Sequence, residues 1–292
     1  MDALRKIADA VLYEGYLLWP YRRSALKNMR RFTFGSLEPQ GTMRTEVLLE
    51  DGGDAAVEVT VRFLQMVRRQ LHRGAEPVDE LTVDGERHLS WEEATEREVL
   101  VSGTGRSPIA IAAGRVEERL SEDASVVRSW EALEGVVSVG AQPLRPGLAR
   151  VTVDISNTTP HGGTLCSTHT ILRVRGGAFV SATDPPEELR AEAEACRNEG
   201  TWPVLVGQPG ERHTMLSSAI ILEEYPRVAP ESPGDLFDGG EIDQLLTLNI
   251  LGLTDEEKSE MRASDPRARE ILERTEALSH EELMRLHGVV RP

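Results

Sequence analysis

Alternation of hydrophobic and polar residues dominates the sequence between residues 36 and 183. In the stretch AVEVTVRFLQMV at 56–67, Val57, Val59, Val61 and Phe63 share one face, while Arg62 and its polar neighbours point to the other. This period of two predicts a half-buried strand. Similar patterns predict further strands at 80–91, 96–102, 107–114, 135–142, 148–156, 164–175, 178–182, 201–207 and 217–225.

Turn-forming residues separate these segments. The sequence EDGGD at 50–54 predicts a hairpin that pairs residues 45–50 with 56–68, and Asp84-Gly85 and Gly176-Gly177 predict two more turns. Short alternating segments with turns between them are typical of a sandwich or a barrel-like sheet.

Helical periodicity is confined to the two ends of the chain and to one internal segment. Residues 4, 7, 8, 11 and 12 are apolar at helical spacing, and Pro20 should end this helix. A second helix is predicted near 186–198, with acidic residues in its first turn. From 241 onward only helices are expected, because Thr254–Glu257 and Ser279–Glu282 both fit the capping box.

These elements predict an α+β protein with three parts. An N-terminal helix and a basic, aromatic segment occupy 1–35. A mainly β body, an antiparallel sandwich or barrel-like sheet with one inserted helix, occupies 36–240, and a helical tail packed on the body occupies 241–292.

Composition narrows the class of protein. The chain has 292 residues and a formal net charge of −16, which disfavours nucleic-acid binding because phosphate backbones are repelled. Two cysteines are too few for the disulfide framework of a secreted protein.

The N-terminal apolar stretch is interrupted by Asp9 and Glu14, so it fits neither a signal peptide nor a membrane span. The expected location is the cytoplasm.

Histidine and cysteine gather in one stretch, HGGTLCSTH, at 161–169. Imidazole and thiolate are the usual ligands of zinc and iron, so a transition-metal site is one hypothesis. If 164–175 is a strand, however, Cys166 and His169 point to opposite faces. The alternative is a buried thiol beside surface histidines. The candidate metal ligands are His161, Cys166, His169, Cys196 and His213.

A basic and aromatic segment follows the first helix. It contains no acidic residue between positions 21 and 31, although the whole chain is acidic. Arginine and aromatic residues are enriched where proteins bind one another, so this segment predicts a partner surface; the alternative is that the aromatic side chains are core and the arginines pair with the chain's own acids. The candidate residues are Trp19, Tyr21, Arg22, Arg23, Lys27, Arg30 and Arg31.

Acidic residues and glycines form two weaker candidates. Asp235, Asp238, Glu241 and Asp243 could hold a hard cation such as magnesium, but carboxylates also favour the start of a helix. The glycine turn at 207–210 lacks the lysine of a phosphate-binding loop, so it indicates a plain turn.

Three segments resemble a known bacterial family. They are LYEGYLLWPYRRSALKN at 12–28, the stretch at 201–258 that begins TWPVLVGQPGERH, and DPRAREILERTEALSHEELMRLHG at 265–288. The family they resemble is encoded beside nickel–iron hydrogenase genes in actinobacteria and other aerobes. The resemblance implies a non-catalytic accessory role in hydrogenase maturation, assembly or stabilisation, with a hydrogenase component as partner. The alternative function is a metal-dependent enzyme or metal-binding protein that uses the His/Cys residues around 161–169.

Overall fold

The computed structural model describes residues 3–13, 34–227 and 250–264, together with 269, 272–273 and 275–278. Strands make up most of it, as the alternating pattern predicts. The helical elements are α1 (Ala3–Tyr13), the 3-10 turn η2 (Glu187–Leu189), α2 (Arg190–Glu194) and α4 (Asp255–Ser264). The strands are β1 (Thr42–Arg73), β2 (Glu76–Val78), β3 (Glu80–Val83), β4 (Glu86–Leu89), β5 (Trp91–Ser102), β6 (Gly105–Ile111), β7 (Gly114–Arg119), β8 (Ala124–Trp130), β9 (Leu133–Arg145), β10 (Leu148–Asn157), β11 (Cys166–Phe179), β12 (Trp202–Leu205) and β13 (Thr214–Ser218).

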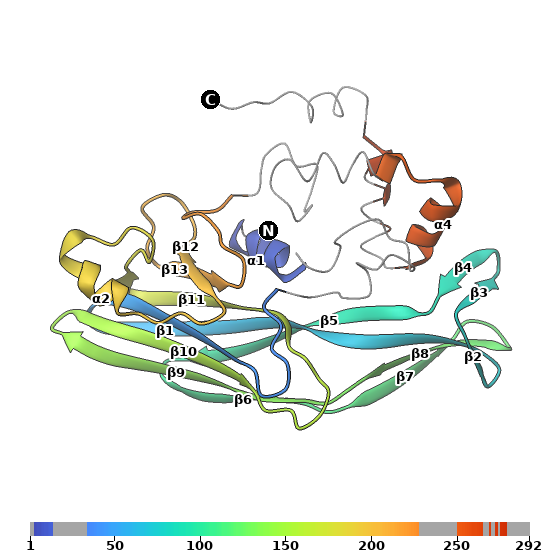
Figure 1. Cartoon of the computed structure of the whole chain (residues 1–292), viewed down its shortest axis with the longest axis horizontal. Helices are drawn as coiled ribbons and strands as arrows, with labels where there is room; N and C mark the ends of the chain where they lie inside the picture. Colours follow the sequence, from blue (N-terminus) through green and yellow to red (C-terminus); the bar gives the residue numbers. More distant parts are fainter. Residues whose placement is uncertain are drawn as a thin grey trace.

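One curled antiparallel sheet contains eleven of these strands. Its main path runs β12-β13-β11-β1-β10-β9-β6, and β2, β5 and β8 also pair with β1. The 32 residues of β1 therefore hold the sheet together: the beginning pairs with β10, the middle with β11 and β5, and the end with β8 and β2. Figure 1 shows β1 running along the length of the molecule.

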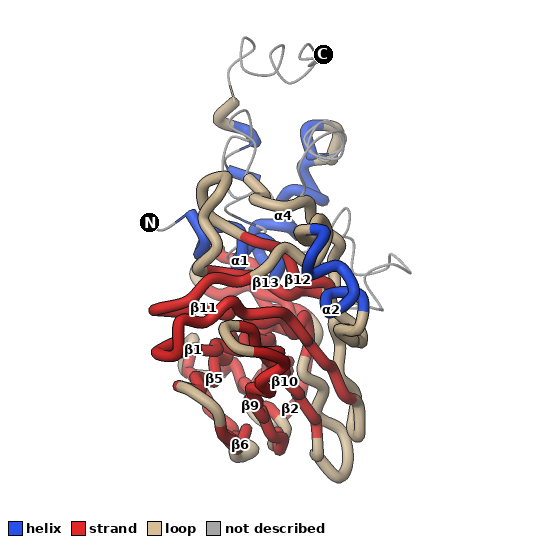
Figure 2. Tube along the Cα trace, turned by 90° about the vertical axis from the view of Figure 1, so that its left-hand side faces the viewer, coloured by secondary structure: helices blue, strands red, loops and turns tan. Residues whose placement is uncertain are grey.

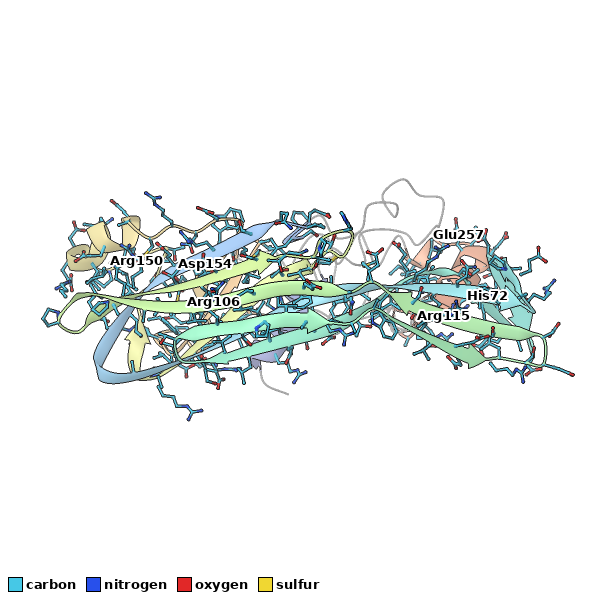
Figure 3. All side chains as sticks on the ribbon, turned by 90° about the horizontal axis from the view of Figure 1, so that it is seen from below. His72, Arg106, Arg115, Arg150, Asp154 and Glu257 are labelled. Carbon is cyan, nitrogen blue, oxygen red and sulfur yellow. The ribbon has the colours of Figure 1, made fainter. Side chains whose placement is uncertain are left out.

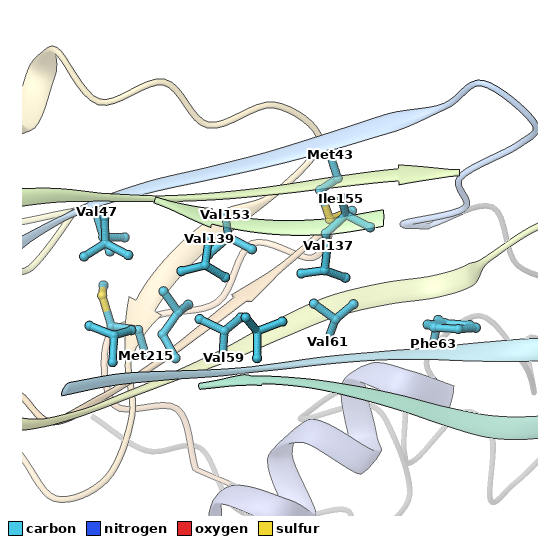
Figure 4. Packing of buried hydrophobic residues seen from close by; sticks show 14 of the residues in the cluster. Met43, Val47, Val59, Val61, Phe63, Val137, Val139, Val153, Ile155 and Met215 are labelled. Carbon is cyan, nitrogen blue, oxygen red and sulfur yellow. The ribbon is translucent and has the colours of Figure 1, made fainter. Parts of the chain in front are cut away.

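The two glycine-rich turns predicted at 50–54 and 176–177 are not hairpins. Strand β1 pairs with β11 on both sides of this point, at Asp51↔Gly177 and at Ala56↔Arg175. Between these pairs, four residues of β1 (52–55) lie opposite a single residue of β11 (176), an excess of three. Because extra residues bend a strand, β1 reverses direction here, and its two halves lie in opposite layers (Figure 4). The halves pair with β10 and β11 and not with each other, so the predicted hairpin pairing is wrong.

The main hydrophobic core lies between the two layers formed by this bend. In Figure 4, Met43 and Val47 from the beginning of β1 face Val59, Val61 and Phe63 from its middle. The last two are fully buried. Valine and isoleucine from β9 and β10 complete the first layer. Burying each such side chain stabilises the fold by about 1.5–3 kcal/mol, so this face of the sheet carries most of the packing energy.

Helices α1 and α4 lie over one side of the sheet, as Figures 1 and 2 both show. Helix α2 packs instead beside Leu48 and Leu148, on β1 and β10. The predicted N-terminal helix is confirmed over Ala3–Tyr13; its apolar positions 7, 8, 11 and 12 are buried and Leu4 is partly buried. The capping box at Thr254 is also confirmed, since the Glu257 carboxylate accepts from Thr254 N at 2.8 Å and Glu257 N donates to Thr254 Oγ1 at 3.3 Å. The internal helix predicted near 186–198 is shorter, ending at Glu194. The second capping box, at Ser279, lies outside the described residues.

Smaller differences concern individual strands. The hairpin at Asp84-Gly85 is confirmed as β3–β4, and both turn residues have positive φ, at 50° and 83°. Strands β7 and β8 were not expected, because GRVEER at 114–119 has no alternation. The strand predicted at 217–225 lies earlier, at Thr214–Ser218. The boundaries of the three predicted parts remain predictions.

The outer face of the layer formed by β9, β10 and the beginning of β1 is largely polar outside the part that α2 covers. Figure 3 views this side and shows Arg106, Arg150 and Asp154 along one half of the molecule, with Arg115 in the other half. Asp154 accepts from Arg44 at 2.7 Å, so neighbouring strands are linked there by exposed ion pairs. None of the helices in the described parts of the chain is both long enough and apolar enough to cross a bilayer.

Candidate functional site

A row of polar residues crosses the sheet beneath α1. Arg62 on β1 pairs with Glu98 on β5 at one side and with His169 on β11 at the other, and His169 in turn pairs with Ser218 on β13. The Arg62 side chain is only 2% exposed, and His169 is fully buried. A charged and a titratable side chain at this depth form the most chemically unusual group in the described residues.

Three carboxylates surround the guanidinium of Arg62. Its Nη2 lies 2.7 Å from Asp9 Oδ1 and 3.1 Å from Glu96 Oε2. Its Nε lies 2.9 Å from Glu98 Oε1, and this last contact is an ion pair without the angle of a hydrogen bond. Tyr13 donates to the other oxygen of Glu96 at 2.6 Å. Since Asp9 and Tyr13 both come from α1, this network ties the helix to the sheet through charge as well as apolar contact.

Apolar side chains enclose the network on both sides. On one side Ile7, Ala8 and Val11 of α1 pack against strands β11, β12 and β13. On the other, Leu12 and Tyr13 pack with Leu64 and Cys166. These contacts exclude water from one side of Arg62, which strengthens its ion pairs and makes an unpaired charge there costly.

A β-bulge places Cys166 and His169 on the same face of the sheet. Arg62 pairs with His169, but Leu64 pairs with Cys166, so β11 contains one residue more than β1 over this stretch. Ser167, at φ 50°, has the left-handed conformation that accommodates the extra residue. The expectation that Cys166 and His169 point to opposite faces is therefore wrong.

His169 is neutral in the folded protein. Burial and the neighbouring positive charge of Arg62 lower its pKa to about 3. Its Nδ1 lies 3.2 Å from the Ser167 carbonyl oxygen, which only accepts, so Nδ1 carries the proton and donates it. Nε2 is left as a buried lone pair with no hydrogen-bond partner among the described residues.

Cys166 is a thiol at neutral pH. Burial raises its pKa to about 12, with a smaller contribution from Glu38 and Glu92. Its Sγ contacts the Thr164 carbonyl oxygen at 3.8 Å. Because the thiolate is both the nucleophile and the metal ligand, this environment suits a packed side chain.

The other predicted metal ligands lie elsewhere. His161 is exposed in the loop before β11. Cys196 follows α2 and packs beside Leu48 and Leu189, where burial raises the pKa of its thiol. His213 is exposed before β13, with Nδ1 3.1 Å from the Gly177 carbonyl oxygen. Among the described residues no three histidine, cysteine or acidic side chains lie close enough together to hold a metal ion. The metal site stays a prediction.

The predicted partner residues, Trp19 to Arg31, lie outside the described residues, as do the acidic residues at 235–243. The residues that flank the partner segment can be placed. Tyr13 bonds to Glu96 in the buried network, and Thr168 N donates to the Gly35 carbonyl oxygen at 2.8 Å. Gly35 has φ 62°, and a Cβ there would lie 2.9 Å from Thr168 O, so this close approach requires glycine.

Sequence reasoning missed Arg62 and its three carboxylates. Period-two alternation assigned Arg62 to a solvated face. Leu64 and Met66 on the same face are apolar, and they are the signal that something covers this part of the strand. The acidic partners come from segments 53 and 34 residues away, a pairing that no local pattern indicates. Compared with protein-family models and with curated proteins, the chain matches none.

Proposed function

We propose that the chain is a non-catalytic accessory protein of a nickel–iron hydrogenase system. It acts in the cytoplasm and assists maturation, assembly or stabilisation by binding a hydrogenase component. The observation that carries this proposal is the likeness of segments 12–28, 201–258 and 265–288 to a family encoded beside hydrogenase genes. In this α+β protein the helical tail at 241–292 closes on the strand-rich body.

The chemistry of the buried network supports a structural role for it. Cys166 is held as a thiol and His169 as a neutral imidazole, and Arg62 is occupied by three carboxylates. The ion pair of Arg62 with Asp9 and the packing of Leu12 on Cys166 hold α1 in place on the sheet. If the buried network is structural, the chain binds its partner through its surface, and the metal chemistry takes place in the hydrogenase component.

The basic and aromatic segment is the proposed contact with that partner. The described residues on either side of it, Tyr13 and Gly35, are both fixed to the sheet beside the buried network. A segment anchored at both ends loses less conformational entropy on binding than a free tail does, which favours affinity. Its positive charge would favour an acidic surface on the hydrogenase component.

Co-purification from a native host tests the proposal. A tagged chain recovered under gentle, low-salt conditions should bring hydrogenase structural subunits with it, identified by mass spectrometry. Replacing Arg22, Arg23 and Arg30 by glutamine should reduce this recovery about tenfold or more, since charged interface pairs contribute a few kcal/mol. The matched control replaces three exposed arginines of the sheet, Arg106, Arg115 and Arg119, and should leave recovery unchanged.

Two results would count against the proposal. Recovery of the wild-type chain with no hydrogenase component would remove the accessory role. If both triple variants recover equally little hydrogenase, the contact does not lie in the basic segment, because the loss then follows net charge alone.

A further inference from the structure

A pocket of about 450 Å³ opens where the bends of β1 and β11 meet the end of β5 and the start of β13. This volume falls within the range of about 300–1,000 Å³ typical of small-molecule sites. The pocket is independent of the buried network and shares only His213 with the predicted metal ligands. Its polar lining comes from Glu58, Ser102, Arg173, Arg175, His213 and Thr214.

Positive charge predominates in this lining although the chain carries a net charge of −16. Arg173 and Arg175 are two residues apart on β11, so both point to the same face of the sheet. Glu58 is the only carboxylate that lines the pocket, and it lies 3.8 Å from Arg173 Nη1, beyond a short hydrogen bond.

Arg175 has no carboxylate partner among the described residues, and it is the arginine of the pocket lining that is free in this sense. By contrast, Arg44, Arg62, Arg69 and Arg128 of the same sheet each lie within 3.3 Å of a carboxylate. An arginine that lines a pocket and has no carboxylate partner among the described side chains is available for a ligand.

The remaining groups fit the same kind of ligand. The contact between His213 Nδ1 and the Gly177 carbonyl oxygen fixes the imidazole ring at the pocket wall. The hydroxyls of Ser102 and Thr214 add two donors. Planar guanidinium groups bind phosphate and carboxylate oxygens through paired hydrogen bonds. We propose that this pocket binds a small molecule through a phosphate or carboxylate group.

Titration of the full-length chain with inorganic phosphate, and separately with citrate, tests the proposal. Ionic strength is held constant with sodium chloride, and binding is followed by calorimetry or by amide chemical shifts. We expect saturable binding of at least one probe. Arg175→Gln and Arg173→Gln should each weaken it about tenfold or more, because a charge-assisted hydrogen bond contributes about 1.5–3 kcal/mol. Binding of phosphate alone or of citrate alone identifies the class of the natural ligand.

Arg115→Gln is the matched control, because Arg115, like Arg175, is an exposed arginine of the sheet, but it does not line the pocket. It should bind like the wild type. Absence of saturable binding of either probe below about 10 mM would overturn the proposal, as would equal affinity in the wild type and both pocket variants. Equal weakening by Arg115→Gln would also overturn it, because that result indicates general screening. None of these outcomes depends on a hydrogenase partner.

Discussion

The two faces of the middle of β1 are built on different principles. The inner face carries Val57, Val59, Val61 and Phe63, which pack against the apolar side chains of the opposite layer. The outer face carries Arg62 between apolar neighbours, under a helix that supplies part of its counter-charge. Both faces are buried, yet only the inner one could be recognised as buried from its residues.

The difference shows what each face contributes. Apolar burial is non-directional and depends little on pH, so the inner face provides stability under all conditions. A buried arginine with partly exposed carboxylates adds little net stability, but it penalises any arrangement that leaves the charge unpaired. The outer face therefore fixes where α1 sits. Its contribution to stability depends on pH through His169, and it is lost when Arg62 or one of its carboxylates is removed.

The largest effect is expected on the inner face. Phe63→Ala removes a fully buried ring from the core and should lower the free energy of unfolding by about 3–5 kcal/mol, measured by urea denaturation. Phe63→Leu keeps most of the volume and should cost less than about 2 kcal/mol. Equal, small losses in both variants would show that the core between the layers is loosely packed.

A smaller effect is expected from Arg62→Met, which replaces the charge by an apolar side chain of similar length. Asp9, Glu96 and Glu98 then lose their shared cation, but they are 24%, 34% and 50% exposed and can be hydrated. The expected loss is therefore about 1–3 kcal/mol, below that of a fully buried pair. In a double-mutant cycle with Asp9→Asn the two changes should couple by about 0.5 kcal/mol or more, and strict additivity would contradict the network.

A last effect, of about 2 kcal/mol between pH 6.5 and 5, is a pH dependence carried by His169. Its pKa is about 3 in the folded protein and 6.5 in the unfolded chain, so between these values the unfolded state binds more protons. Stability should therefore be complete above pH 6.5 and fall as the pH is lowered, by up to about 1.4 kcal/mol per pH unit.

Unfolding free energies measured between pH 7.5 and 5 should show this slope. His169→Gln should flatten it, whereas the same change at exposed His161 should leave it intact. An unchanged slope in His169→Gln would show that other groups cause the acid sensitivity.

The strands could largely be predicted because alternation is local and visible in the sequence. The pattern at 56–67, the turn at Asp84-Gly85 and the capping box at Thr254 are each decided by neighbours within a few residues. The strand pairing at 50–54 was not predictable in the same way. Glycine and aspartate fit both a hairpin and a bulge, and the partner strand β11 decides between them.

The candidate site was less predictable, because it depends on one extra residue and on long-range charge pairs. The bulge at Ser167 reverses the facing of Cys166, and no residue type at 166–168 signals it. Arg62 meets Asp9 across 53 residues and Glu96 across 34. Such pairs follow from topology, which becomes known only when the sheet order is known.

The length of β1 also has a consequence for synthesis of the chain. Its beginning, at 42–50, pairs with β10, whose first residue leaves the ribosome about 100 residues later. At about 5–20 residues per second this leaves the nascent segment without that partner for roughly 5–20 seconds. During this interval its hydrogen-bonding edge and its apolar side chains are open to other chains, and this interval is when a chaperone would be needed most.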